Sequence, residues 1–338
     1  MKDIPRPAAD TPVEPTRLLV LSEGLYNMNN STLALVDLSS NSTDYDIFKT
    51  LNHRGLGDTA NDLKRYGAKI YIPVNISSTL EIIDATSLIS IKRLTITTPE
   101  GTARQPRRIA FHDGFAYLTC FDGTLIEIDT ASLEITRTVT LGRNPDHLAI
   151  CNGKAYVSNS GGLDYPYYDA TVSVVDLATM TELRRVPVGQ NPGCIEASER
   201  GDIYVVSRGD YDLNDYTLHK IDTDIDTVVR SFPDIHPLNF CIVGNTLYMY
   251  NYNFADASHW VKSFDCITDR ITNDNLLPEN LTLTTPFSIT VDPSSEEIFL
   301  TDANSFILFG HLICINPDGT LRYIISEIGL NPNGILIL

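Results

Sequence analysis

A dipeptide returns along this sequence at nearly even intervals, and that regularity decides which folds are open to the chain. An apolar residue followed by Asp, or by Asn at the last repeat, closes one short run of residues after another. The positions are Val36-Asp37, Ile83-Asp84, Ile128-Asp129, Val175-Asp176, Ile221-Asp222, Phe264-Asp265 and Ile315-Asn316, spaced by 43 to 51 residues. Such a period indicates a chain of repeated units, and no unit shows a helical period.

The unit is clearest between Pro145 and Asn191, where turn residues such as Asn152-Gly153 separate four short apolar, alternating or mixed runs. Runs of this kind predict a four-stranded antiparallel sheet. One such sheet cannot cover both of its faces, but seven of them in a ring cover each other and leave only short edges. We therefore predict an all-β fold, a single seven-bladed β-propeller with four antiparallel strands per blade.

The two ends of the chain predict how the ring closes. Residues 333–338 have the pattern of a first strand with no second strand after it, whereas residues 17–21 resemble a second strand with no first strand before it. The C-terminal strand should therefore close the first blade. Within the ring, we expect an outer strand of blade 1 near residues 44–51 and a first strand of blade 2 from about residue 58.

Three entries to first strands share the pattern Gly-x-Asn-Pro. They begin at Gly142, Gly189 and Gly329. Glycine tolerates a positive φ, and proline can open a strand because its missing N–H costs little there. We expect the glycine to take the positive φ at each of these corners.

The net charge and the cysteines limit the partners and the site chemistry that we expect. The 338 residues include 43 acidic and 25 basic side chains, which gives a formal net charge of −18. Phosphate backbones and anionic membranes would be repelled, so nucleic acid is not an expected partner. The six cysteines lie singly in predicted strands and are expected to be buried hydrophobes rather than disulfides or metal ligands.

The chain is expected to divide into a tether and one domain. Residues 1–15 are rich in proline, aspartate and alanine and predict an extended N-terminal tether, followed by the propeller at residues 16–338. No apolar run approaches the ~18 residues of a membrane-spanning helix, and no signal-peptide pattern is present. A methionine set directly on such a tether suggests a mature form whose leader has been removed.

Loop lengths point to one face of the predicted ring. From the middle of the second strand to the Asp or Asn marker, blades 2 and 3 have the shortest connections and the other five carry extra residues. In a propeller these loops rise on the same face as the entries to first strands. Because loops on a rigid scaffold hold most binding residues, we expect the site on this face.

The long loops are rich in aromatic and amide side chains, which solvated loops do not need. Tyrosine and tryptophan bury large apolar areas while keeping a polar end, which suits a ligand with both kinds of surface. The candidate ligand-binding residues are Tyr26, Asn27, Arg104, Arg143, Asn159, Tyr165, Tyr167, Arg208, Tyr211, Tyr252, Trp260 and Phe306. Two alternatives stay open: the rings can pack on neighbouring loops, and Arg104 and Arg143 can pair with the chain's own carboxylates.

Motifs for catalysis are absent from the sequence. No HExxH, GxSxG, Walker or GxGxxG pattern occurs, and the seven histidines are scattered. Asp210, Asp212 and Asp215 could hold a cation, but only the acidity of their loop suggests it. We assign no catalytic residue, no metal ligand and no catalytic cofactor, and we expect a binding protein rather than an enzyme.

Particular residues resemble a known family. The run from Ser158 to Asp169, with Asn144-Pro145, Arg104 to Arg107 and Asn331-Pro332, is similar to the YncE-like seven-bladed propeller lipoproteins of Bacteroidetes. The similarity covers the chain after about Thr16. Within these proteins the chain looks most like the surface lipoproteins that capture vitamin B12 (cobalamin) and sit over a TonB-dependent cobalamin transporter.

That resemblance implies a function. It implies a non-enzymatic cell-surface protein of the outer membrane, lipid-anchored in its precursor, that captures a corrinoid and hands it to the transporter. Cobalamin is then a ligand rather than a catalytic cofactor, and the protein is expected to be a monomer apart from the transporter. Two other classes stay open: a scaffold that binds glycans or proteins, and a propeller enzyme such as a lyase or lactonase.

Overall fold

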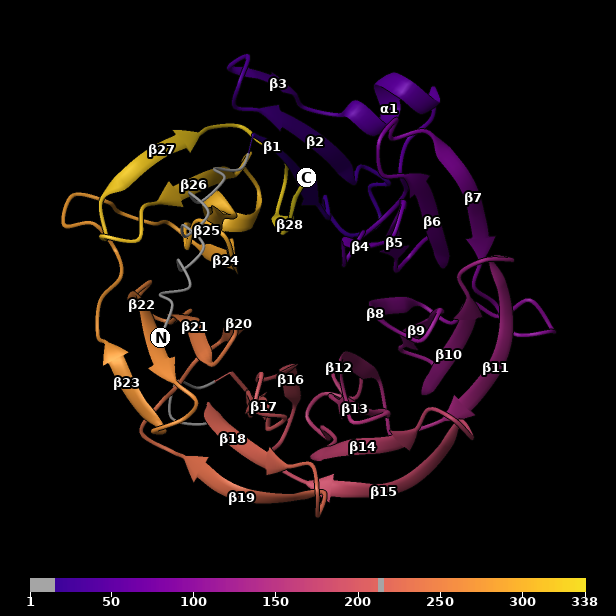
Figure 1. Ribbon diagram of the computed structural model, residues 1–338. Helices are drawn as coiled ribbons and strands as arrows, with labels where there is room; N and C mark the ends of the chain where they lie inside the picture. Colours follow the sequence, from indigo (N-terminus) through magenta and orange to yellow (C-terminus); the bar gives the residue numbers. More distant parts are fainter. Residues whose placement is uncertain (1–15, 212–215) are drawn as a thin grey trace, which may run out of the picture.

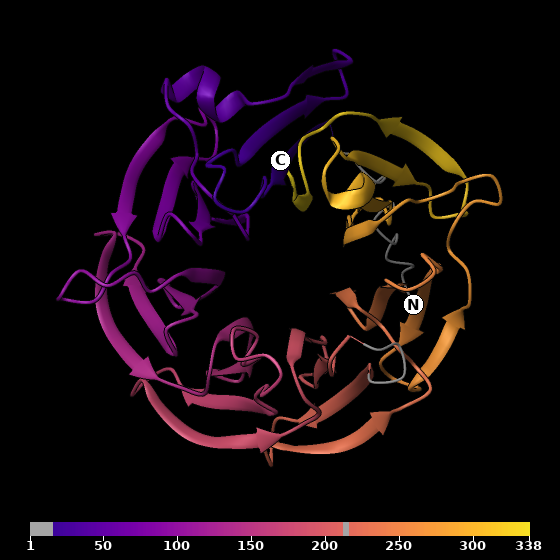
Figure 2. The same ribbon diagram turned by 180° about the vertical axis from the view of Figure 1, so that it is seen from behind.

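Seven sheets surround a central channel in the computed structural model, which describes residues 16–211 and 216–338 (Figure 1). Each sheet has four antiparallel strands, and the view from behind shows the same continuous ring (Figure 2). The predicted all-β, seven-bladed propeller is therefore confirmed. The predicted tether, residues 1–15, lies outside the described residues.

The first three blades contain the following strands, named from the channel outward. Blade 1 has β28 (Pro332–Ile337), β1 (Arg17–Ser22), β2 (Thr32–Asp37) and β3 (Ser42–Asp44). Blade 2 has β4 (Lys64–Tyr66), β5 (Lys69–Val74), β6 (Thr79–Asp84) and β7 (Ser90–Thr95). Blade 3 has β8 (Pro106–His112), β9 (Phe115–Cys120), β10 (Thr124–Asp129) and β11 (Glu134–Thr140).

The other four blades follow the same order. Blade 4 has β12 (Pro145–Cys151), β13 (Lys154–Asn159), β14 (Thr171–Asp176) and β15 (Thr181–Pro187). Blade 5 has β16 (Pro192–Ala197), β17 (Ile203–Ser207), β18 (Thr217–Asp222) and β19 (Thr227–Phe232). Blade 6 has β20 (Asn239–Val243), β21 (Thr246–Tyr252), β22 (His259–Asp265) and β23 (Arg270–Asn273). Blade 7 has β24 (Pro286–Val291), β25 (Ile298–Asp302), β26 (His311–Ile315) and β27 (Leu321–Ile325).

The ring closes through the C-terminal strand, as predicted. β28 pairs antiparallel with β1, with Leu18 opposite Ile337 and Val20 opposite Ile335. The Leu338 N–H donates to the Arg17 carbonyl at 3.0 Å. Both ends of the described chain therefore lie on one face of the ring.

The expectation for the outer strand of blade 1 is wrong. The outer strand of blade 1 is only three residues long, and the chain then forms a helix, α1 (Ile47–Asn52), because the Asp46 side chain accepts a hydrogen bond from the Lys49 N–H at 3.2 Å and caps it. Blade 2 begins near residue 58, as expected: Ala60 forms an antiparallel bridge with Val74 of β5, and the regular pairing of β4 follows from Lys64.

The repeated aspartate has a structural role in the turn between third and fourth strands. Asp84 Oδ1 accepts hydrogen bonds from the Thr86 and Ser87 N–H groups at 3.0 and 2.8 Å, and Asp129 Oδ1 does the same with the next residues of its own turn. An aspartate that binds its own backbone two and three residues on favours such a turn. We call the face that carries these aspartates the turn face.

The residue with positive φ at the Gly-x-Asn-Pro entries is not the one expected. Asparagine takes the left-handed conformation, with φ of 46° at Asn144 and 52° at Asn191, whereas Gly142 and Gly189 do not have a positive φ. Those glycines are needed for space: a Cβ on Gly142 would lie 2.5 Å from Asn159 Cγ. Only at the third entry, beginning at Gly329, does the glycine itself take a positive φ.

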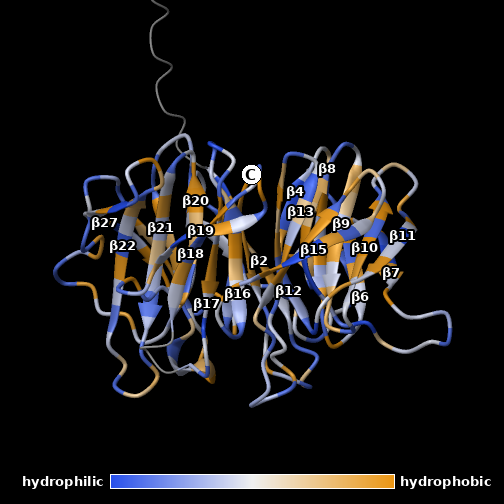
Figure 3. Ribbon diagram, turned by 90° about the horizontal axis from the view of Figure 1, so that it is seen from below, coloured by the Kyte–Doolittle hydropathy of each residue, from blue (hydrophilic) through white to orange (hydrophobic). Residues whose placement is uncertain are grey.

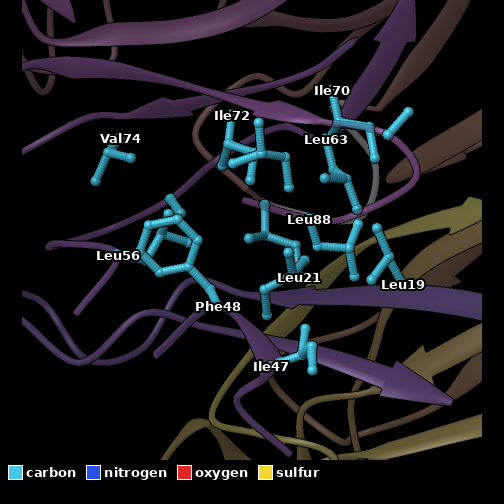
Figure 4. Close-up of a cluster of buried hydrophobic side chains, with 14 residues drawn as sticks. Leu19, Leu21, Ile47, Phe48, Leu56, Leu63, Ile70, Ile72, Val74 and Leu88 are labelled. Carbon is cyan, nitrogen blue, oxygen red and sulfur yellow. The ribbon is translucent and has the colours of Figure 1, made fainter. Parts of the chain in front are cut away.

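The hydrophobic core lies between neighbouring blades. In Figure 4, Leu19 and Leu21 of β1 pack with Ile70 and Ile72 of β5, and Phe48 of α1 covers the same cluster. Each such buried side chain contributes roughly 1.5–3 kcal/mol relative to exposure. The six cysteines are free, and four of them are buried with these apolar residues.

The two faces of the ring differ in outline. Figure 3 shows long loops projecting from one side of the ring, with hydrophobic colour concentrated in the strands between the faces. We call this the loop face; it carries the connections from second to third strands and the entries to first strands. No described helix is long and apolar enough to cross a membrane.

Candidate functional site

The loop face is uneven, as the loop lengths predict. In blades 2 and 3 the second and third strands are joined by residues 75–78 and 121–123, whereas in blades 4 and 7 the same connections are residues 160–170 and 303–310. The face is therefore low over two neighbouring blades and raised over the others. Two groups of side chains on it can contact a ligand.

The first group is a network of buried charges at the mouth of the channel. Asp146, at the start of β12, pairs with Arg107 of β8 at 3.1 Å and with Arg208, which follows β17, at 3.2 Å. The Arg208 guanidinium also donates to Asn191 Oδ1 at 3.1 Å. One carboxylate of blade 4 thus joins two arginines, from blades 3 and 5.

The network continues into blades 1 and 2. Arg107 donates to Asn61 Oδ1 at 2.5 Å, and the Asn61 amide donates to Glu23 Oε2 at 3.2 Å. Asn333, from the strand that closes the ring, donates to the same Glu23 oxygen at 3.2 Å. We call Glu23, Asn61, Arg107, Asp146, Asn191, Arg208 and Asn333 the mouth network.

Burial sets the charge states in this network. Burial alone would raise the pKa of Asp146, but Arg107, His147 and Arg208 outweigh it and hold that pKa well below its usual value. Burial lowers the pKa of His147 to about 4, with Arg108 adding to the effect. Burial also raises the pKa of Glu23. Near neutral pH, Asp146 is therefore an anion and His147 is uncharged.

The second group is a set of aromatic rings above blades 5 to 7. Phe254 lies at the centre: its ring centroid is 6.3 Å from Tyr211, 5.1 Å from Tyr252 and 6.4 Å from Phe306, and Phe306 lies 5.7 Å from Phe287. Such spacings are those of interacting aromatic pairs. We call Tyr211, Tyr252, Phe254, Phe287 and Phe306 the aromatic wall.

The wall remains open to solvent and is joined to the mouth network. The exposed fraction is 52% for Phe254 and 42% for Tyr211. The Arg208 guanidinium lies 5.8 Å from the centroid of the Tyr211 ring, within the range of a cation–π contact. Arg208 therefore contacts both a buried carboxylate and the first ring of the wall.

Unusual backbone conformations hold part of the wall in place. Asn304, Ser305 and Phe306 have φ of 45°, 68° and 66°, and Tyr211 has φ of 72°. Consecutive non-glycine residues with positive φ persist only where surrounding contacts enforce them, and they are frequent at ligand sites. Here Asp302 Oδ1 accepts the Asn304 N–H at 2.8 Å.

The structure brings some of the candidate residues together. Arg208, Tyr211, Tyr252 and Phe306 form one connected group across blades 5 to 7. On other loops of the same face, the exposed fractions of Tyr26, Tyr165 and Tyr167 are 70%, 72% and 76%. The Asn27 N–H donates to Asp58 Oδ1 at 3.2 Å.

Other candidates have structural partners. Arg104 pairs with Asp122 at 2.6 Å and Arg143 with Asp164 at 2.7 Å, which is the alternative that the sequence left open for both. Asn159 is fully buried and donates to Ser173 Oγ at 2.8 Å.

Trp260 is half-buried and packs against the core between blades 5 and 6, with the Lys262 ammonium 4.9 Å from its ring centroid. Neither Trp260 nor Asn159 belongs to the aromatic wall.

Sequence reasoning missed most of the mouth network. The missed residues lie at or near strand ends, and their side chains contact residues of other blades. They are Glu23, Asn61, Asp146 and Asn333. Asp146 and Arg107 each follow a proline that opens a first strand, and that shared position is the signal that could have identified them. Phe287 also follows such a proline.

The described residues contain no group of three or more His, Cys, Asp or Glu side chains placed to hold a metal ion. Of the aspartates considered for a cation, Asp212 and Asp215 lie outside the residues that the structure describes. The geometry therefore offers aromatic, amide and buried ion-pair chemistry on the loop face.

A closed seven-bladed β-propeller with one elaborated face is thus the class that fold and site define. The chain belongs to the family described as domain of unknown function (DUF5074), whose model matches residues 17–316. No protein with a curated description matches the chain in sequence.

Solved structures resemble the chain in fold. A quinoprotein alcohol dehydrogenase-like protein of Bacteroides thetaiotaomicron is 17% identical, with a TM-score of 0.68 over 96% of this chain and 78% of that one. Hydrazine synthase of Kuenenia stuttgartiensis is 14% identical, with a TM-score of 0.66 over 81% and 88%. The computationally designed Ika8 protein is 13% identical, with a TM-score of 0.60 over 94% and 90%. At these identities the likeness concerns the fold alone.

Proposed function

We propose that this protein is a non-enzymatic binding protein that captures a corrinoid, with cobalamin as the expected ligand. The observation that carries the proposal is the aromatic wall beside the mouth network on the loop face. About half of the surface of Phe254 and of Tyr211 is exposed in the wall. Apolar ring surface in contact with water is unfavourable unless a ligand covers it.

The chemistry of a corrinoid matches both groups of side chains. Its macrocycle is broad and partly apolar, which suits contact with the rings of the wall. Its edge carries amide groups, which can accept hydrogen bonds from arginine or asparagine and donate them to carboxylate or carbonyl oxygens. The resemblance of residues 158–169 to vitamin B12-capturing lipoproteins points to the same ligand.

The place of the chain ends fits a protein held at a surface. The Thr16 carbonyl accepts the Leu38 N–H at 2.8 Å on the turn face, where the C-terminal residue also lies. A lipid anchor upstream of Thr16 would leave the loop face unobstructed. The proposal, which rests here on the family resemblance, includes attachment to the outer membrane and a TonB-dependent cobalamin transporter as the partner.

Isothermal titration calorimetry tests the ligand directly. Purified protein is titrated with cyanocobalamin and, as a matched control, with protoporphyrin IX, a flat macrocycle that lacks the amide edge. The proposal expects saturable one-to-one binding of cobalamin and much weaker binding of the porphyrin. Absence of cobalamin binding, or equal affinity for both macrocycles, would contradict it.

A further inference from the structure

A second site lies inside the channel, below the mouth network. The strand register places one residue of each innermost strand at the same level. Lys64 pairs with Tyr71 and Glu196 with Tyr204, at equivalent positions of blades 2 and 5. Figure 1 shows β4 and β16 across the channel from one another. A cation and an anion therefore face each other at one level of the channel.

The two charges do not contact each other. Among the described residues, Lys64 has no hydrogen-bond or ion-pair partner, and Glu196 accepts a single hydrogen bond, from the Ile242 N–H to Oε2 at 2.6 Å. Lys64 lines the channel cavity, and its side chain is exposed there. Burial raises the pKa of Glu196, while Lys64 acts across the channel in the opposite sense.

The rest of this level leaves room between the charges. Four of the other five residues there are small, namely Ala110, Ala149, Cys241 and Thr290. The channel cavity has a volume of about 650 Å³ and is lined by all of these residues. That volume lies within the range of small-molecule sites.

The level above holds a second pair of opposite charges, Asp62 and Arg108. Asp62 lies 3.8 Å from Arg108, and its carboxylate oxygens accept the Leu63 and Ile109 N–H groups at 2.9 and 3.0 Å. Asp62 is also the nearest strong influence on Lys64, since its charge is the largest cause that raises the pKa of Lys64. At the level of Lys64 and Glu196 themselves, the groups offered to an occupant are one ammonium and one carboxylate on opposite walls.

We propose that the channel binds a small zwitterion of the free amino acid class, whose carboxylate meets Lys64 and whose ammonium meets Glu196. An anion or a cation alone would answer only one of the two facing charges. A zwitterion answers both at once. The site is separate from the aromatic wall, so its occupation does not depend on the proposed binding of a corrinoid.

Saturation-transfer NMR measures this binding. Glycine, L-alanine and L-glutamine are each added at about 10 mM, a concentration suited to weak ligands. Propionate and ethylamine serve as the two halves of alanine. Lys64→Met and Glu196→Gln alter the site, and Lys49→Met and Glu134→Gln are matched changes at exposed positions outside the channel.

The expected result is binding of at least one amino acid, with affinity reduced about tenfold or more by each channel variant, a loss of about 1.4 kcal/mol. The two surface variants should match the wild type, and each half-ligand should bind more weakly than alanine. Thermal unfolding of every variant confirms that the ring is intact. No binding of any of the three amino acids, or equal binding by folded channel variants, would overturn the inference.

Discussion

The turn face and the loop face of this propeller are built from the same strands but differ in regularity. On the turn face, aspartates at one position of the first six repeats bind the backbone that follows, as Asp37, Asp84 and Asp129 do. On the loop face no two long connections share a sequence, and one group of their rings, the aromatic wall, lies over blades 5 to 7. The repeated turns thus stabilise the fold, whereas the loops that differ from blade to blade carry the candidate site.

The largest expected effect concerns the mouth network. Asp146→Ala would leave Arg107 and Arg208 without their shared carboxylate in a buried position. Breaking a buried pair in this way costs about 3–5 kcal/mol of unfolding free energy. Denaturant unfolding measures the loss. Asp164→Ala, which removes the exposed partner of Arg143, is the control and should cost at most about 1 kcal/mol. Equal losses would contradict the central role of Asp146.

A substitution in the strained loop of blade 7 tests stability and ligand binding separately. Ser305 has φ of 68°, a conformation that glycine adopts without strain. Ser305→Gly should therefore keep or raise the free energy of unfolding, by up to about 1 kcal/mol. It should nevertheless weaken cobalamin binding, because Phe306 would be less firmly held. Chemical denaturation and calorimetry measure the two quantities, and a stability loss with unchanged affinity would refute this assignment.

On the turn face, Asp84→Ala should lower the midpoint of thermal unfolding modestly, by roughly 2 °C, since it removes the acceptor of two turn N–H groups. Cobalamin affinity should not change, because the turn lies on the opposite face. Differential scanning calorimetry with and without ligand checks both. A clear loss of affinity in this variant would show that the faces are coupled.

The two faces should also respond oppositely to acid. Hydrogen bonds from Ser39 and Ser40 lower the pKa of Asp37 from 3.8 to about 2, so its stabilising effect is present above pH 3.8 and is lost as the pH falls toward 2. Burial raises the pKa of Glu23 above 4.5, so its effect is present at low pH and is lost as the pH rises.

Stability measured against pH should therefore change below pH 4 in Asp37→Asn, and above pH 4.5 in Glu23→Gln. The same pH profile in both variants would contradict the assignment. The effect is expected to be the smallest of this series, because Asp37 is fully exposed.

The sequence predicts the ring well because its signals repeat. Seven markers give seven blades, and the unpaired end runs give the closure by β28. Helix α1 escapes prediction because six residues are too short to show a period and its capping residue, Asp46, is a local signal. The left-handed asparagines escape because glycine at the same corner is the simpler expectation.

The candidate site is only partly predictable for a related reason. Rings on long loops can be identified from the sequence, and three of them, Tyr211, Tyr252 and Phe306, each contact the Phe254 ring. Contacts between blades cannot be read in this way: Asp146 lies 39 residues from Arg107 and 62 from Arg208. Whether Asn159 faces solvent or the core depends on its place at the end of β13, which the loop composition does not reveal.

The most direct test of the account is the cobalamin affinity of Phe254→Ala and Tyr211→Ala, measured by calorimetry beside Tyr45→Ala. Tyr45 is similarly exposed, at 51%, but lies at the outer edge near α1. Truncating a central interface ring costs about 2 kcal/mol, so each wall variant should bind roughly 30-fold more weakly, whereas Tyr45→Ala should match the wild type. Wild-type affinity in both wall variants would show that the aromatic wall is not the binding site.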